Sequence, residues 1–244
     1  MEEMIDRKSL RFSAILLVAG VVLFILVTVL FHPGSAPDND EVGTFRGYAN
    51  STYWSLIHGF QFAGNLIIVF GLLALFSALN VKSGLVGVLN RFAAYSAVAS
   101  LAFFAAVYAV DGIALRQTID AWLNAPPSVQ SAYFAVAQGI RVLEWGVRGY
   151  SDHLTGLSLV LFATVITLTG RISRPIGFIM GLNGLGFIVR GFTYSLTTIT
   201  ALYSTPPSMN EALTIYVIDH GLLVWTVWLL ISAYRMEQPI AKTP

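Results

Sequence analysis

The chain has 244 residues, of which 56% are hydrophobic and 11% are charged, whereas about a quarter of the residues in soluble domains are charged. A water-exposed fold is therefore excluded, and the net charge of +1 provides no basic field for a nucleic-acid partner. The absence of cysteine excludes disulfides, thiolate metal sites and cysteine nucleophiles.

Six stretches are apolar over about 20 residues, the length that a helix needs to cross a bilayer core of roughly 30 Å. They cover approximately residues 12–31, 54–79, 92–115, 151–170, 176–198 and 213–234. Helices are expected because every backbone polar group must be satisfied within its own segment in lipid. The sequence predicts an all-α integral membrane protein of the cell membrane, with residues 1–244 forming one domain of six transmembrane helices surrounded by the lipid bilayer.

The Lys and Arg residues between these stretches predict the orientation, because the cytoplasmic loops of membrane proteins carry the excess of positive charge. One side receives nine of them: Arg7, Lys8, Arg11, Lys82, Arg91, Arg171, Arg174, Arg235 and Lys242. The other side receives four: Arg46, Arg116, Arg141 and Arg148. Both termini are therefore expected in the cytoplasm.

The connections on the outer side differ in length and character. Residues 32–53 are polar and contain two prolines, so an irregular solvated segment is expected. The third and fourth helices are expected to extend as an outward hairpin that turns near residues 124–128. On the returning arm, a spacing of three or four residues places four charges on one helical face: Arg141, Glu144, Arg148 and Asp152. This row is interpreted as a solvated ladder of ion pairs or, alternatively, as an electrostatic entrance to a site below.

Ionisable residues in the outer third of five helices form the main functional signal. His58, His153 and His220 lie one each on the second, fourth and sixth helices, within about 10 Å of one another in depth. Asp111 and Arg190 lie in the same zone on the third and fifth helices. Charged groups are costly in a membrane, so these residues are expected to face a shared polar cavity that opens outward.

Further polar side chains are expected to line the same cavity. Gln61 and Asn65 follow His58 at helical spacing and form a polar stripe on one face. The other expected lining residues are Tyr108, Asp152, Tyr194 and Asp219.

Several functions are compatible with this set of residues. In a metal-dependent enzyme, the three histidines would bind Zn, Cu or Fe, with Asp111 as fourth ligand or base and Arg190 stabilising negative charge. Haem b between two histidines is an alternative cofactor. In a structural interpretation, polar groups join the helices and Asp111 pairs with Arg190. A non-catalytic accessory subunit of a larger membrane complex, or a protein that binds an unidentified small molecule, is the contrasting function.

The fifth helix is rich in glycine, which predicts close approach of neighbouring helix backbones. Trp54, Trp225 and Trp228 are expected to be interfacial or lipid-facing anchors. The segment from His153 to Gly191 contains Leu154-Thr155-Gly156-Leu157 and a short basic turn at residues 171–175. It resembles an uncharacterised bacterial family of six-span integral membrane proteins, a domain of unknown function. The resemblance implies the architecture and no activity.

Overall fold

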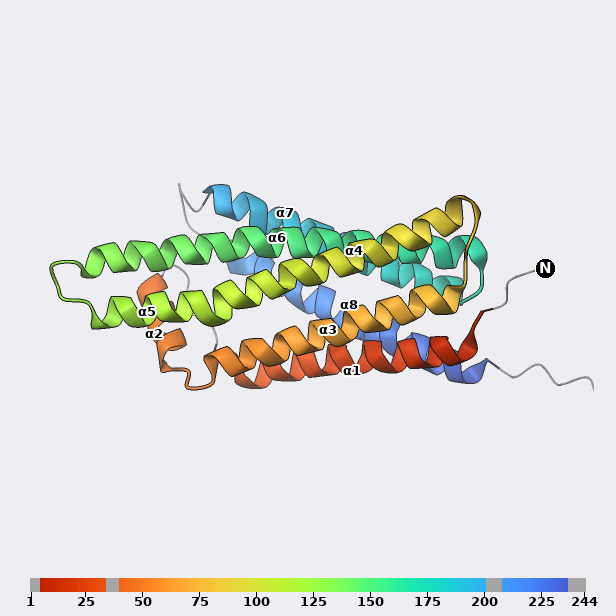
Figure 1. Ribbon diagram of the computed structural model, residues 1–244, viewed down its shortest axis with the longest axis horizontal. Coiled ribbons are helices and arrows are strands. Elements are labelled where there is room, and N and C mark those ends of the chain that lie inside the picture. The colour runs from red at the N-terminus through yellow and green to blue at the C-terminus, as the bar shows by residue number, and fades with distance from the viewer. Residues whose placement is uncertain (1–4, 34–39, 201–207, 237–244) are drawn as a thin grey trace, which may run out of the picture.

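The computed structural model consists of long helices that run nearly parallel (Figure 1). It describes residues 5–33, 40–200 and 208–236, and only the backbone at 196–200, 208–217 and 219. The long elements are α1 (Arg7–Phe31), α3 (Trp54–Leu79), α4 (Gly84–Ala109), α6 (Gln130–Thr169), α7 (Arg174–Thr200) and α8 (Ser208–Arg235). The shorter ones are α2 (Glu41–Asn50), the π-helical turn η1 (Val110–Leu115) and α5 (Arg116–Asn124). The prediction of an all-helical chain is confirmed for the described residues.

Five helices in the described part are long and apolar enough to cross a membrane. They are α1, α3, the continuous helix Gly84–Asn124, α6, and α7 up to Ser195. The sixth expected span, residues 213–234, lies within α8, where all side chains before residue 218 are outside the described residues.

The helix ends follow from local chemistry. Asp6 precedes α1, and its carboxylate accepts hydrogen bonds from the backbone N–H groups of Lys8 and Ser9. Asn80 ends α3 with a φ of 47°, and Gly170 ends α6 with a φ of 61°. Both values lie in the left-handed region, which lets the chain reverse sharply into the next helix.

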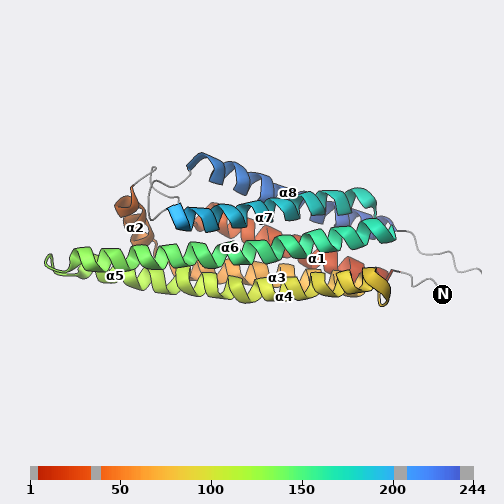
Figure 2. The same cartoon turned by 90° about the horizontal axis from the view of Figure 1, so that it is seen from above.

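The six long helices form a closed ring in chain order, because each contacts the next and α8 returns to α1. In Figure 2, α6 lies between α3 and α4 on one side and α7 and α8 on the other. Glycines allow the closest approach: a Cβ on Gly156 would lie only 2.5 Å from the backbone oxygen of Gly184. The glycines of α7 therefore act as the sequence predicts.

The hairpin formed by α5 and α6 extends past the ends of the other helices (Figure 1). With 40 residues, α6 is about 60 Å long at 1.5 Å per residue, twice the depth of a bilayer core. We call α2, α5 and residues 130–148 of α6 the headpiece. Its helices share a core with η1 and the start of α3, made of Phe45, Tyr48, Trp54, Leu115, Ile119, Trp122 and Ala137.

The helix α2 lies in a segment that the sequence predicts to be irregular. Its amino acids are polar and include Gly43 and Gly47, so propensity alone does not favour a helix. The helix forms because Phe45 and Tyr48 are buried against the hairpin, with aromatic contacts from Phe45 to Trp122 and Phe134. Tertiary packing therefore overrides the local preference.

Candidate functional site

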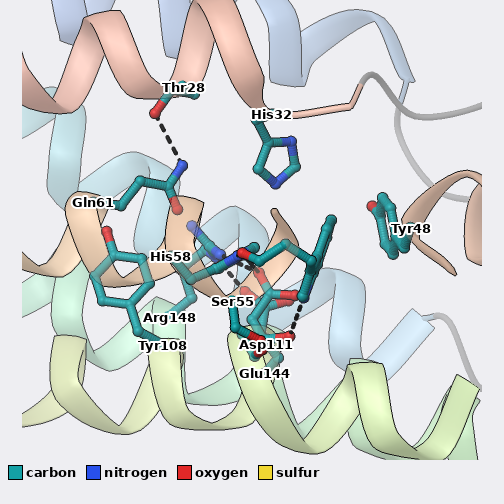
Figure 3. A network of polar contacts seen from close by, with 12 residues as sticks. Thr28, His32, Tyr48, Ser55, His58, Gln61, Tyr108, Asp111, Glu144 and Arg148 are labelled. Carbon is teal, nitrogen blue, oxygen red and sulfur yellow. Dashed lines mark hydrogen bonds and ion pairs between the residues drawn. The ribbon is translucent and has the colours of Figure 1, made fainter. Parts of the chain in front are cut away.

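A network of buried charged groups lies where the headpiece meets the ring of helices (Figure 3). We call it the Asp111 network and define it as His58 from α3, Asp111 from η1, and Arg141, Glu144 and Arg148 from α6. The network therefore joins two helices of the ring to the base of the headpiece.

The π-helical turn positions Asp111. A π-turn opens the regular hydrogen-bonding pattern of an α-helix and often marks a functional position. Here α3 supplies donors to the backbone: Trp54 Nε1 donates to the carbonyl oxygen of Asp111 at 2.8 Å, and Ser55 Oγ donates to that of Gly112 at 2.7 Å. Only glycine fits at position 112, since a Cβ there would lie 2.7 Å from the Cβ of His58. These contacts fix the carboxylate of Asp111 against α3.

Each carboxylate of the network contacts both arginines. Asp111 Oδ1 lies 3.4 Å from Arg141 Nη1, and Asp111 Oδ2 lies 3.3 Å from Arg148 Nη2. Glu144 Oε2 lies 3.0 Å from Arg141 Nη1, and Glu144 Oε1 accepts a hydrogen bond from Arg148 Nε. The carboxylate side chains are at most 3% exposed, so burial without these arginines would be strongly unfavourable.

His58 completes the network on the α3 side. Its Nδ1 lies 2.8 Å from the backbone oxygen of Trp54, and its Nε2 lies 3.1 Å from Asp111 Oδ2. The second contact joins a buried ring nitrogen, which has no hydrogen-bond partner among the described residues, to a carboxylate oxygen. The ring also packs at 4.4 Å between centroids on Trp54, which in turn packs on Tyr48 at 4.3 Å.

His32 lies beside this stack, immediately after the last residue of α1 (Figure 3). Its ring centroid is 5.3 Å from that of Trp54 and 5.5 Å from that of His58. Burial lowers the pKa of His32 to about 4, so this ring is neutral at pH 7. The sequence did not single out His32, because it lies outside every apolar stretch.

A second buried ion pair lies near the Asp111 network on α6 and α7. Asp152 is fully buried, and Arg190 binds it through two hydrogen bonds of 2.8 Å, from Nε and Nη2. This fork-to-fork geometry is the strongest arrangement of these two groups. Arg190 therefore binds Asp152, whereas Asp111 binds the arginines of its own network.

The two carboxylates in the row of charges along α6 are buried, whereas the side chains of Arg141 and Arg148 are 22% and 27% exposed. Glu144 and Asp152 are both 0% exposed. Tyr48 of α2 lies over part of this row of charges. Its ring is 5.6 Å from the guanidinium carbon of Arg141, and its hydroxyl is 3.3 Å from Arg141 Nη2. The ion pairs along α6 are present, but their solvated character does not hold for the two carboxylates.

The three histidines expected to bind a metal have different surroundings. His58 belongs to the Asp111 network, His153 packs against Phe192 with 4.5 Å between ring centroids, and His220 is exposed. The part of the chain that the structure describes contains no group of three or more His, Asp or Glu residues able to hold a metal ion. A metal site built from His58, His153 and His220 is not supported by this arrangement.

The expected polar stripe of α3 is buried. Asn65 Nδ2 donates to the Tyr108 hydroxyl at 2.7 Å. Gln61 Nε2 donates to Thr28 Oγ1 at 3.0 Å (Figure 3). Tyr194 lies with its ring 5.9 Å from the guanidinium carbon of Arg148. The side chain of Asp219, the remaining expected lining residue, is outside the described residues.

Two of the three tryptophans expected to be interfacial or lipid-facing anchors are instead buried. Trp54 is 1% exposed and Trp225 is fully buried, with Nε1 of Trp225 donating to Asn183 Oδ1 at 3.1 Å. Neither faces lipid, whereas Trp228 is 39% exposed as expected. No feature of the sequence distinguishes these tryptophans, because an indole N–H finds a partner equally well at an interface and in a core.

Comparisons with known proteins identify no relative of this chain. No family model, curated protein or solved structure matches the chain. Its function must therefore be argued from the site itself.

Proposed function

We propose that this chain is a six-span membrane protein that acts as a non-catalytic binding or accessory subunit. Both termini lie in the cytoplasm, and the headpiece lies on the outer side of the membrane. The orientation rests on the excess of Lys and Arg at the opposite end from the headpiece. The sixth span is α8, which closes the ring between α7 and α1.

The observation that carries the proposal is the internal pairing of charge in the Asp111 network. Asp111 and Glu144 each contact two arginines, and the second carboxylate on α6, Asp152, is held by Arg190. Because these carboxylates and arginines pair with one another, they hold the headpiece at a fixed position on the ring of helices. A fixed headpiece suits a subunit that presents a binding surface.

The headpiece offers such a surface along α6. Val136 is 52% exposed and Leu143 is 51% exposed, and Gly139 between them has open space around it. This face carries no charge, because the charged residues of the same segment point toward the network. An uncharged apolar face outside the membrane favours contact with another membrane subunit.

Topology can be tested directly because the chain has no cysteine. A single cysteine introduced at Ser128, in the turn of the hairpin, should react with a membrane-impermeant maleimide in intact cells. A cysteine at Ser83, between α3 and α4, should react only after the membrane is opened. The reverse pattern would refute the orientation and place the headpiece in the cytoplasm.

Binding of a partner can be tested with a photo-crosslinking amino acid at Leu143 in native membranes. A single discrete adduct with a second protein is expected, and it should be lost when the crosslinker is moved to Gln117 on α5. Crosslinking only to lipid, or equally at both positions, would contradict the accessory role.

Metal analysis separates this proposal from a metal-dependent enzyme. The purified chain should contain less than one equivalent of Zn, Cu or Fe, and His153→Ala should leave that content unchanged. One equivalent of metal that is lost in His153→Ala would overturn the proposal.

A further inference from the structure

The two ring nitrogens of His58 face different acceptors, which determines where its protons lie. Nδ1 is 2.8 Å from the backbone carbonyl oxygen of Trp54. A carbonyl oxygen can only accept, so Nδ1 must carry the hydrogen of this bond. In a neutral imidazole, Nε2 would then be a bare acceptor with no hydrogen.

That second nitrogen lies 3.1 Å from Asp111 Oδ2, and both side chains are 3% exposed. A bare nitrogen and an ionised carboxylate would be two acceptors facing each other in a buried place, which is unfavourable because neither could form a hydrogen bond to the other. We propose that His58 and Asp111 hold one exchangeable proton between them, so that this contact is a proton-binding site. The proton comes from water and returns to water, and no redox step is involved.

The charges around the pair are compatible with gain and loss of this proton. Arg141, Glu144 and Arg148 approach from α6, and Tyr108 of α4 lies 6.2 Å from His58 between ring centroids. With the proton bound, three positive charges of the Asp111 network face two carboxylates. After its release, two guanidinium groups balance the two carboxylates, so neither state leaves a large uncompensated charge.

The surroundings also indicate the side from which the proton exchanges. His32 is partly exposed, and its ring lies 5.5 Å from that of His58, next to Tyr48 of α2 (Figure 3). Further along α3, away from the headpiece, the buried side chains include Leu72 and Leu75. Exchange with water is therefore expected from the headpiece side of the molecule, past His32.

Nitrogen NMR of isotope-labelled histidine measures this proton. The combined variant His32→Gln, His153→Gln and His220→Gln leaves His58 as the only histidine of the full-length protein in detergent micelles. At neutral pH, both ring nitrogens should give the chemical shifts of a protonated imidazolium, whereas a neutral imidazole would show hydrogen on Nδ1 alone. Comparison of the wild type with His58→Gln identifies the same signals should the combined variant not fold.

Two carboxylate variants provide the comparison. Asp111→Asn should give neutral His58 at neutral pH, because an amide has no negative charge to hold the proton. Asp120→Asn is the matched control, since Asp120 pairs with Arg116 outside the network, and it should leave the His58 signals unchanged.

Infrared spectroscopy covers the case in which the proton lies on the carboxylate. Neutral His58 together with a carboxylic-acid band that disappears in Asp111→Asn would support the shared proton equally. Neutral His58 with an ionised Asp111 at neutral pH would overturn the proposal. A His58 signal that changes on treatment with a metal chelator would also overturn it, because Nε2 would then be bound to a metal.

Discussion

Replacing one member of the Asp152–Arg190 pair should be among the most destabilising polar substitutions in the molecule. The pair has two N–O distances of 2.8 Å, and its side chains are 0% and 15% exposed. At this distance, attraction between unit charges is about 6 kcal/mol with an effective dielectric constant of about 20. The cost of removing both groups from water offsets much of it, so the intact pair adds little net stability.

Breaking the pair is different, because the remaining charge stays buried without its partner. Asp152→Asn or Arg190→Gln should each lower the free energy of unfolding by about 3–5 kcal/mol. For a chain of this size, about 2–4 °C per kcal/mol corresponds to a fall in melting temperature of about 6–20 °C. The double substitution should recover part of this loss, because no unpaired charge is left.

Thermal unfolding of the purified protein in detergent provides the assay. Asp120→Asn is the control, because Asp120 is 48% exposed and pairs with Arg116 one helical turn away. Exposed pairs of this kind contribute about 0.3–0.5 kcal/mol, so the control should melt within about 2 °C of the wild type. Equal effects of Asp152→Asn and Asp120→Asn, or a double variant whose loss equals the sum of the single losses, would refute the reasoning.

Two further predictions concern local geometry, and thermal or chemical unfolding checks both. Gly112→Ala should destabilise the protein by about 1–3 kcal/mol, because its Cβ would lie 2.7 Å from that of His58. Gly139→Ala has open space and should stabilise α6 by up to about 1 kcal/mol, so equal effects of the two would contradict the close contact. Asp6→Ala should cost about 1 kcal/mol through loss of the helix cap. The Ser9 hydroxyl holds the pKa of the Asp6 carboxyl below its ordinary value of 3.8. The cost of Asp6→Ala should therefore be present above pH 3.8 and disappear as the pH falls through the lowered pKa. A cost that does not depend on pH would contradict the role of Asp6 as a helix cap.

The helices could be predicted from the sequence because apolar runs of about 20 residues have few alternatives to a helix. The turns after Asn80 and Gly170 lie where the apolar runs end. Helical spacing also placed Gln61 and Asn65 on one buried face of α3. In each case the information lies within one segment.

The partners of the charged groups could not be predicted in the same way. Spacing along α6 shows that Arg141 and Arg148 share a face, but it does not show which helix lies opposite that face. The sequence suggests Asp111 as a partner of Arg190 because both lie at a similar depth, but depth does not distinguish neighbours around a ring. Burial of Glu144 was also missed, because it depends on the arrangement of α2 and the hairpin around it.

The π-turn at Val110–Leu115 has a consequence for comparing this chain with homologues that differ in length. Such a turn accommodates one residue more than an α-helix over nearly the same rise and rotation, because its hydrogen bonds join residues i and i+5 instead of i and i+4. Deleting one residue there would restore a regular α-helix and would hardly change the length of the hairpin or the orientation of α5 relative to α4. Ile119 and Trp122 would then stay in the headpiece core. A homologue one residue shorter at this point would keep the same outer surface on α5 and would differ mainly where Asp111 and Gly112 lie.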